Sequence, residues 1–111
     1  MIAKARAATI TGIEAVPVVV EVDLTGAKAE FVIVGLPDKS VQESQERVKA
    51  AILNSDLPFP FTRVVCNLAP GDVRKEGPLL DLPIALAVLA AGGQVAEGAG
   101  LVGAEILEAA A

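Results

Sequence analysis

The chain has 111 residues and a mass of 11.3 kDa, which is the size of a single domain. Nine Lys and Arg residues stand against fourteen Asp and Glu residues, the formal net charge is −5, and there is one Cys and no His, Trp or Tyr. These counts exclude imidazole-based catalysis, an intramolecular disulfide and a zinc site built from several thiolates, and they disfavour a nucleic-acid binder that works by electrostatics alone.

The N-terminal third of the chain is predicted to form strands. Residues 15–24 (AVPVVVEVDL) are rich in Val and partly alternate, which places Glu21 and Asp23 on one face of a strand. Residues 30–34 (EFVIV) form a second strong candidate, and the turn at 25–28 between the two predicted strands indicates a hairpin. A short mixed segment at 6–10, followed by a turn at Thr11-Gly12, is counted as the first strand.

The clearest predicted helix begins at Ser40. Ser40 and Glu43 match a capping box, in which a hydroxyl and a carboxylate each accept a backbone amide proton at the helix start. Apolar and small residues recur at helical spacing from Val41 to Ser55, and Glu43 and Arg47 form a favourable i,i+4 pair. The sequence NSDLP at 54–58 ends this helix.

A strand at 62–68 (TRVVCNL) and a second helix at 82–91 follow. Asp81 is the expected N-cap of that helix, Pro83 lies in the tolerated first turn, and Gly92-Gly93 ends it. Because the helix is apolar on all sides, we expect it to be buried on most faces. A further short strand is predicted at 101–104, and the order β-β-β-α-β-α-β predicts an α+β fold, a mixed α/β two-layer sandwich with one sheet.

The mean hydropathy of +0.58 is high for a soluble protein, so a membrane segment has to be considered. The longest charge-free apolar run covers only residues 82–93 and contains Pro83, whereas a spanning helix needs about 20 residues. Polar residues such as Thr9 and Glu14 also interrupt any leader-like stretch at the N-terminus. We therefore expect a soluble, cytoplasmic domain without a membrane partner.

Charge is distributed unevenly along the chain. All nine basic residues lie at or before Lys75 and are balanced by nine acids in the same stretch, whereas the five later acids have no bases among or after them. Either residues 76–111 form an acidic interaction tail, or the chain is one domain of a longer protein whose balancing bases lie further on. We favour the second interpretation, with residues 1–111 as a single domain.

The sequence gives little support for a nucleotide-binding or nucleophilic site. Residues 98–103 (GAGLVG) match the dinucleotide pattern G-x-G-x-x-G, but they follow a helix end rather than a strand, so a Gly-rich turn is favoured over a cofactor site. No G-x-x-x-x-G-K-[ST] motif for phosphate binding occurs. Cys66 lies in the middle of an apolar strand and is expected to be a buried core thiol.

The loop at 70–78 (PGDVRKEGP) is the remaining candidate site. Its acids Asp72 and Glu76, together with Asp81, suggest paired carboxylates for acid–base catalysis, although turn, solvent-facing and cap roles are favoured. The same loop lies between a strand end and a helix start, where an anion or a partner could bind, and a solvated connection is the competing interpretation. The candidate interaction residues are Asp72, Arg74, Lys75, Glu76 and Gly77.

Two separated motifs resemble the N-terminal domain of the Mg-chelatase-like ComM/YifB family of AAA+ proteins. The first is 67–78 (NLAPGDVRKEGP), which is followed by 81–86 (DLPIAL). The second is 34–38 (VGLPD) with the helix positions 41, 43, 44, 47 and 48, and the opening 12–15 (GIEA) also matches. The resemblance covers about residues 4 to 104, and the ending GAEILEAAA departs from the family pattern.

The resemblance implies a fold similar to the Lon protease proteolytic domain and to the second domain of a small-subunit ribosomal protein. It also implies an AAA+ ATPase module outside this chain, which would bind ATP and Mg, with neighbouring subunits arranged in a hexamer and DNA branch migration during natural transformation as the activity. No catalytic residue, cofactor or metal is then expected in these 111 residues themselves. The alternative is a small enzyme on the same fold that uses Asp72, Glu76 or Asp81.

A comparison with Lon-type proteases points in the same direction. In the protease, the segment that resembles residues 75–78 (KEGP) is followed by the nucleophilic Ser, whereas this chain has Leu79 at that position. Leucine carries no group that can attack a carbonyl carbon, so the resemblance implies that a Ser-Lys dyad is absent here.

Overall fold

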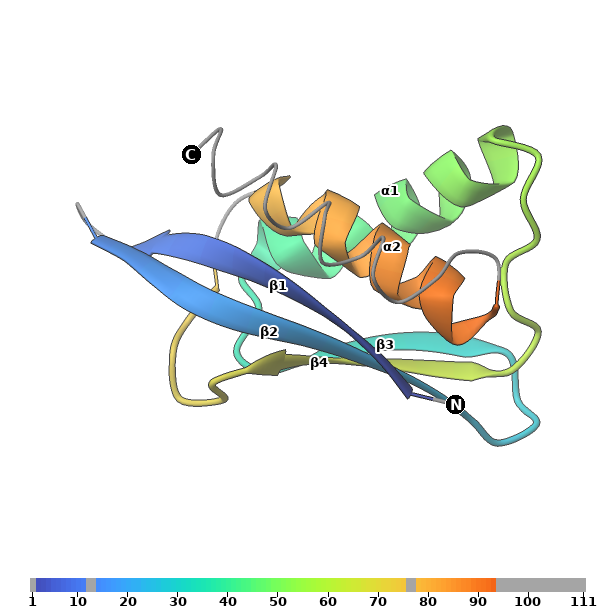
Figure 1. Cartoon of the computed structure of the whole chain (residues 1–111), viewed down its shortest axis with the longest axis horizontal. Coiled ribbons are helices and arrows are strands. Elements are labelled where there is room, and N and C mark those ends of the chain that lie inside the picture. Colours follow the sequence, from blue (N-terminus) through green and yellow to red (C-terminus); the bar gives the residue numbers. More distant parts are fainter. Residues whose placement is uncertain (1, 12–13, 76–77, 94–111) are drawn as a thin grey trace.

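The computed structural model describes residues 2–11, 14–75 and 78–93, in which four strands form one mixed sheet (Figure 1). The strand order is β1-β2-β4-β3, and the strands are β1 (Ile2–Thr11), β2 (Glu14–Thr25), β3 (Glu30–Val34) and β4 (Arg63–Ala69). β2 is antiparallel to both β1 and β4, whereas β3 runs parallel to β4. The parallel pair requires a crossover connection, and a helix provides it.

Two helices cover one side of this sheet, as Figure 1 shows. They are α1 (Lys39–Asn54), in the crossover from β3 to β4, and α2 (Asp81–Ala91), which follows a short 3₁₀ turn, η1 (Pro78–Leu80). The predicted α+β class, with one mixed sheet and a layer of helices, is therefore confirmed in outline. No helix in the described part of the chain has both the length and the apolar character needed to cross a membrane.

The core lies between the helices and the sheet. Alternate residues of β2 and β4 point into it, and Val20, Val22, Val64 and Cys66 are fully buried. β1 contributes three alanines, Ala3, Ala5 and Ala7, and the buried Thr9 continues the same alternation. α2 is buried on most sides, as its all-round apolar sequence predicts.

Cys66 is a core thiol, as predicted. No part of its side chain is exposed, and burial raises the pKa of the thiol from 9.0 to about 12, because the thiolate would lose its hydration. The thiol therefore stays protonated, and hence unreactive, at neutral pH.

The hairpin predicted between β2 and β3 is wrong. The turn at residues 25–28 does join the two strands in sequence, but β4 lies between them in the sheet and bonds to both. β1 and β2 are the strands that pair as sequence neighbours. The whole of β1 pairs with residues 14–23 of β2, from Ile2 opposite Asp23 to Thr11 opposite Glu14. β1 is also twice as long as the predicted segment at 6–10.

Both helix starts differ from the predicted caps. α1 begins at Lys39, and its N-cap is Asp38, whose Oδ1 accepts the amide proton of Val41 at 2.8 Å, so the Ser40–Glu43 capping box is wrong. In α2, Asp81 is the first helical residue and makes no cap hydrogen bond, because its carboxylate is bound by side chains of α1. The strand predicted at 101–104 and the glycine-rich motif at 98–103 lie outside the described residues.

Candidate interaction site

The candidate site lies at the end of the sheet where the parallel strands β3 and β4 finish. Because parallel strands have their carboxyl ends at the same end of a sheet, the segments that follow them are brought together there. The segment after β3 is residues 35–38 (GLPD), and the segment after β4 is the loop at 70–75 (PGDVRK), which begins after a cis peptide bond between Ala69 and Pro70. We call these two segments together the paired loops.

Gly35 allows the paired loops to approach each other. Its φ angle is +111°, and a Cβ atom at this position would lie 2.2 Å from the carbonyl oxygen of Leu68 in β4. Only glycine avoids both the unfavourable φ angle and this clash. The sequence GLPD therefore places a glycine where the end of β3 passes closest to β4.

The backbone of Lys75 joins the paired loops directly. Its amide donates to the carbonyl oxygen of Leu36 at 3.0 Å, and its own carbonyl accepts the amide proton of Asp38 at 2.9 Å. These two bonds form a parallel β-bridge between Pro37 and Lys75. Because Asp38 is also the N-cap of α1, the loop after β4 fixes the start of that helix.

The side chain of Lys75 lies inside the loop and bonds to the backbone at its start. It is fully buried, and its Nζ donates a hydrogen bond to the carbonyl oxygen of Pro70. Burial lowers the pKa of Lys75 from its ordinary value of 10.5, and the negative charge of Asp72 partly opposes that shift. A lysine whose charge is directed inward at a backbone carbonyl holds the loop closed on itself and is not presented to a ligand.

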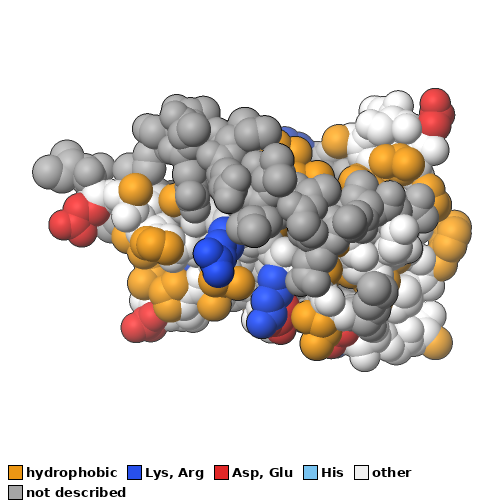
Figure 2. Space-filling view, viewed as in Figure 1, with side chains coloured by type: hydrophobic (Ala, Val, Ile, Leu, Met, Phe, Trp, Pro, Cys, Tyr) orange, Lys and Arg blue, Asp and Glu red, His pale blue; other side chains and the backbone are white. Residues whose placement is uncertain are grey.

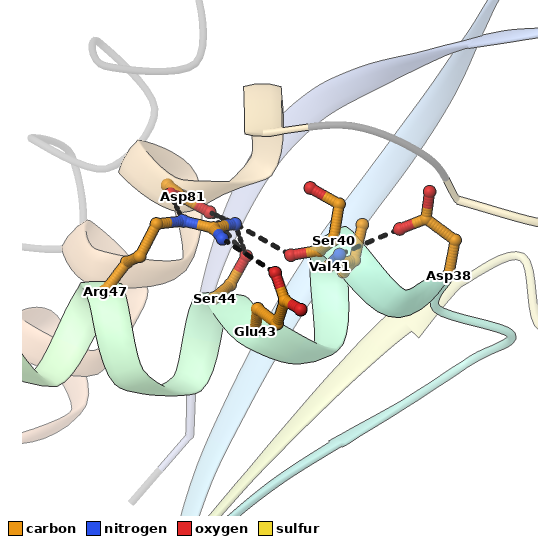
Figure 3. Close-up of polar contacts among 7 residues, drawn as sticks. All are labelled: Asp38, Ser40, Val41, Glu43, Ser44, Arg47 and Asp81. Atoms are coloured by element: carbon orange, nitrogen blue, oxygen red, sulfur yellow. Dashed lines mark hydrogen bonds and ion pairs between the residues drawn. The ribbon is translucent and has the colours of Figure 1, made fainter.

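A polar cluster of Ser44, Arg47 and Asp81 ties the two helices together beside the paired loops (Figure 3). Arg47 donates from Nε to Asp81 Oδ2 at 2.6 Å and from Nη2 to Oδ1 at 3.0 Å. The buried Ser44 hydroxyl donates to Asp81 Oδ1, and Arg47 also bonds the carbonyl oxygen of Ser40 at 2.7 Å. The hydrogen bond to Asp81 raises the pKa of Arg47 further above its ordinary value.

This cluster anchors the far end of the loop that begins at Pro70. Asp81 is the first residue of α2, and its partners Ser44 and Arg47 lie one turn apart on α1. Glu43 adds a weaker contact, 3.9 Å from Arg47 Nη1. The chain from Pro70 to Asp81 is therefore held at its middle by Lys75 and at its end by the cluster.

The structure places the predicted site residues in different environments. Asp72 and Arg74 are exposed at the surface of the loop, whereas Lys75 is buried beneath it. Glu76 and Gly77 lie outside the described residues. Asp81 is bound by Arg47 and Ser44 instead of facing Asp72, so those two carboxylates do not form an acid–base pair. Within the ranges described, no group of three or more His, Cys, Asp or Glu side chains could hold a metal ion.

The site residues that were not predicted from the residue pattern alone are Gly35, Asp38, Ser44 and Arg47. Asp38 and Gly35 belong to a G-L-P-D sequence directly after a strand, a signal of a tight strand-to-helix turn. Leu36 lies between them with a positive φ of 53° and a side chain that is 53% exposed. An exposed leucine in a left-handed conformation is costly unless the surrounding bonds hold it, as the Lys75 bridge does.

Comparison with known proteins decides the family. Residues 20–106 match the family model described as subunit ChlI of Mg-chelatase. The chain belongs to this ChlI family. The match spans both of the paired loops and the polar cluster, so these features lie in the family's own region of the sequence.

Curated proteins similar to this chain include a competence protein and several uncharacterised proteins of bacteria. The chain is 46% identical over 84 residues to competence protein ComM of Haemophilus influenzae, covering 76% of this chain and 16% of the relative. It is 44% identical over 84 residues to protein YifB of Escherichia coli, covering 76% and 17%, and 35% identical over 88 residues to an uncharacterised protein of Mycobacterium tuberculosis, covering 79% and 18%. The chain thus spans about a sixth of the length of these relatives, and the ComM/YifB resemblance is confirmed.

Proposed function

We propose that this chain is a non-catalytic accessory domain of a Mg-chelatase-like AAA+ ATPase, and that the paired loops bind the ATPase module or a neighbouring subunit. The carrying observation is that Lys75 fixes the paired loops to each other and fixes the start of α1. A surface held in one conformation before binding loses less entropy when a partner docks, which is what a stable contact between modules requires.

The exposed residues of the paired loops support a binding role. Leu36, in the segment after β3, is 53% exposed, and Asp72 and Arg74 are exposed in the loop whose Lys75 bonds to that segment. Exposed apolar and charged side chains on the same pair of segments are a composition that protein–protein interfaces use.

The same geometry supports a non-catalytic role. Asp81 is neutralised by Arg47, Cys66 is buried with a pKa of about 12, and the ammonium of Lys75 is directed at a backbone carbonyl. Of the candidate groups singled out above, Asp81, Cys66 and Lys75 are therefore engaged in holding the fold, whereas Asp72 is exposed. Leu79, at the position of the protease nucleophile by resemblance, is part of η1 and 38% exposed.

The relatives support a wider role for the longer protein. We propose that the longer protein binds ATP and Mg in its AAA+ module, assembles as a hexamer in the cytoplasm and acts in DNA branch migration, in line with the competence role in the name of the Haemophilus influenzae relative. The mixed sheet with both helices on one side is compatible with a Lon-like arrangement, which belongs to the same proposal.

The test uses a protein of the relatives' length that contains this chain. Arg74→Ala removes an exposed charge from the loop without touching the buried Lys75, and it should weaken subunit assembly and DNA-stimulated ATP hydrolysis at least about threefold, since an interface charge contributes on the order of 1 kcal/mol. Lys28→Ala, an exposed charge removed from the turn at the opposite end of β3, is the matched control and should change neither. If both variants behave like the parent, the paired loops are not the contact.

The non-catalytic part of the proposal is tested on the 111-residue chain alone. We expect no ATP hydrolysis and no cleavage of unfolded casein above the buffer blank. Of the candidate acids Asp72, Glu76 and Asp81, Asp72 is the one that the described part of the chain shows as exposed. Turnover that persists after repeated purification and is lost in Asp72→Asn would therefore show that the domain is an enzyme.

A further inference from the structure

A second feature lies at the opposite end of the sheet, in the connection from α1 to β4. Its sequence Pro58-Phe59-Pro60-Phe61 buries one aromatic ring and exposes the other. Phe59 is only 9% exposed and packs on Phe31, with ring centroids 5.4 Å apart, whereas Phe61 is 90% exposed. Figure 2 shows hydrophobic side chains at the end of the molecule where Figure 1 places this connection.

The two prolines hold this connection in position. Each proline fixes its own φ angle and restricts the residue before it, so Phe59 and Phe61 alternate between core and solvent on a stiff segment. An exposed aromatic side chain on a stiff support is a typical anchor in protein–protein interfaces, because little conformational entropy is lost when it is buried.

Hollows lie on both sides of Phe61. One has a volume of about 380 Å³, and its apolar lining includes Phe31, Leu53 and Phe59 together with Phe61 itself. Polar side chains complete its wall, namely Glu30, Gln45, Glu46 and Lys49. The other has a volume of about 240 Å³ and is lined by Leu24, Val88 and Leu89. Since an apolar cavity of about 150 Å³ is large enough to bind benzene, either hollow is large enough to take a phenylalanine ring.

The charges around the larger hollow are balanced. Glu30, Glu46 and Lys49 line the hollow, and Arg63, whose Nε is 3.3 Å from Glu30 Oε2, supplies the second positive charge beside it. The chain as a whole carries a net charge of −5, which opposes self-association, but these four groups sum to zero. Two copies of the face can therefore meet without strong net repulsion.

We propose that this face binds a second copy of the chain about a two-fold axis, with Phe61 of each copy inserted into the larger hollow of the other. A two-fold interface is self-complementary, so it needs the projecting group and its receptor on the same surface. Here the exposed ring, a hollow large enough for that ring and a balanced set of charges lie together within one face.

The face around Phe61 does not overlap with the paired loops. Those loops follow the carboxyl ends of β3 and β4, whereas the hollow is lined by residues at and before the start of β3 and before β4. Neighbours in a cyclic hexamer meet through unlike surfaces, so this two-fold contact would join subunits of two separate rings and leaves the paired loops for contacts within one ring. Failure of one proposal therefore leaves the other unaffected.

The first experiment is sedimentation velocity on the chain over a range of concentrations. We expect a monomer–dimer equilibrium whose dissociation constant rises at least about tenfold in Phe61→Ser, since truncating an interface anchor has effects of that size. Ala29→Arg, which places a long charged side chain into the same hollow and leaves Phe61 intact, should have the same effect. Ile2→Ser is the matched control, because it removes another exposed apolar side chain, 52% exposed, from β1 at the opposite sheet edge.

The second experiment uses the absence of Trp and Tyr from the chain. In Phe61→Trp the new indole is the only one present, and its large ring should still enter the hollow of a second copy. We expect its emission to shift to shorter wavelength and its quenching by iodide to fall as concentration rises, with both changes abolished by Ala29→Arg.

The outcomes are decisive. If the parent chain stays monomeric at millimolar concentration, the proposal is overturned. The same holds if the Phe61→Ser variant dimerises as tightly as the parent. If the indole remains fully accessible to iodide in a dimer, the copies associate through another face and the proposal is equally overturned.

Discussion

Replacing Gly35 by alanine should be the most damaging small substitution near the candidate site. The change adds one methyl group at a residue whose φ is +111°, and this methyl carbon would be 2.2 Å from the carbonyl oxygen of Leu68, where real Cβ contacts essentially never fall below 3.0 Å. The obstructing atom belongs to the backbone of β4, which bonds to strands on both sides and cannot move alone.

The expected magnitude follows from two separate terms. A non-glycine residue in this backbone region carries a strain of about 1–3 kcal/mol. Forcing a methyl group into a packed site adds about 1–3 kcal/mol. We therefore expect a loss of about 4 kcal/mol in the free energy of unfolding, a large part of the 5–15 kcal/mol that is typical of a whole domain.

Urea unfolding followed by circular dichroism measures this loss, and thermal unfolding should show a drop in Tm of about 20 °C. The matched control is Gly71→Ala in the paired loops, where an added Cβ meets no atom within 4 Å and the stability should change by less than about 0.5 kcal/mol. A Gly35→Ala variant within 1 kcal/mol of the parent would show that the close approach of β3 to β4 is not a constraint on the fold.

Three further predictions concern the cap, the polar cluster and the core thiol. Asp38→Ala should lower the free energy of unfolding by about 1 kcal/mol in urea titrations, and Asp38→Ser should restore most of it; equal losses in both would refute the capping role. A double-mutant cycle of Arg47→Ala and Asp81→Ala should give a coupling of about 1 kcal/mol, because both side chains are partly exposed; additive losses would show that the bidentate contact contributes nothing. Because burial raises the pKa of Cys66 from 9.0 to about 12, the native state binds more protons than the unfolded state in that interval, and stability should fall as pH rises from 9 to 12 by up to about 4 kcal/mol. Cys66→Ala should remove that part of the slope, and an unchanged alkaline slope would contradict the assignment.

Local patterns in the sequence were enough to predict most elements and their buried faces. The strand at 30–34 matches the structure at both ends, and the apolar strand at 62–68 correctly predicts that Cys66 is buried. These patterns work because burial on one face of a strand or helix leaves a periodic trace in the residues themselves.

The errors share one physical cause, which is contact between residues far apart in the chain. The Ser40–Glu43 capping box is locally reasonable, but Asp38 becomes the cap because its amide bonds to the carbonyl of Lys75. Asp81 looks like an N-cap, but Arg47, 34 residues away, binds its carboxylate. Neither partner can be inferred from the neighbouring sequence.

The sequence predicted where the candidate loop lies in the chain but not which of its side chains are exposed. Its charged run at Arg74-Lys75 suggests two exposed cations, whereas the structure exposes one and buries the other. The residue pattern cannot distinguish them, because only the bridge to the segment after β3 turns Lys75 inward.

The position of β4 between β2 and β3 also determines the order in which the fold can form. The N-terminal strands up to Val34 include β3, which has no partner until residues 63–69 have joined the sheet. During synthesis, the β1–β2 pair is therefore made first. The apolar β3 then stays unpaired until β4 has been synthesised, about thirty residues later. Such non-local pairing favours slow, all-or-none folding, and it makes nascent chains that stop before residue 63 the species most exposed to aggregation and to chaperone binding.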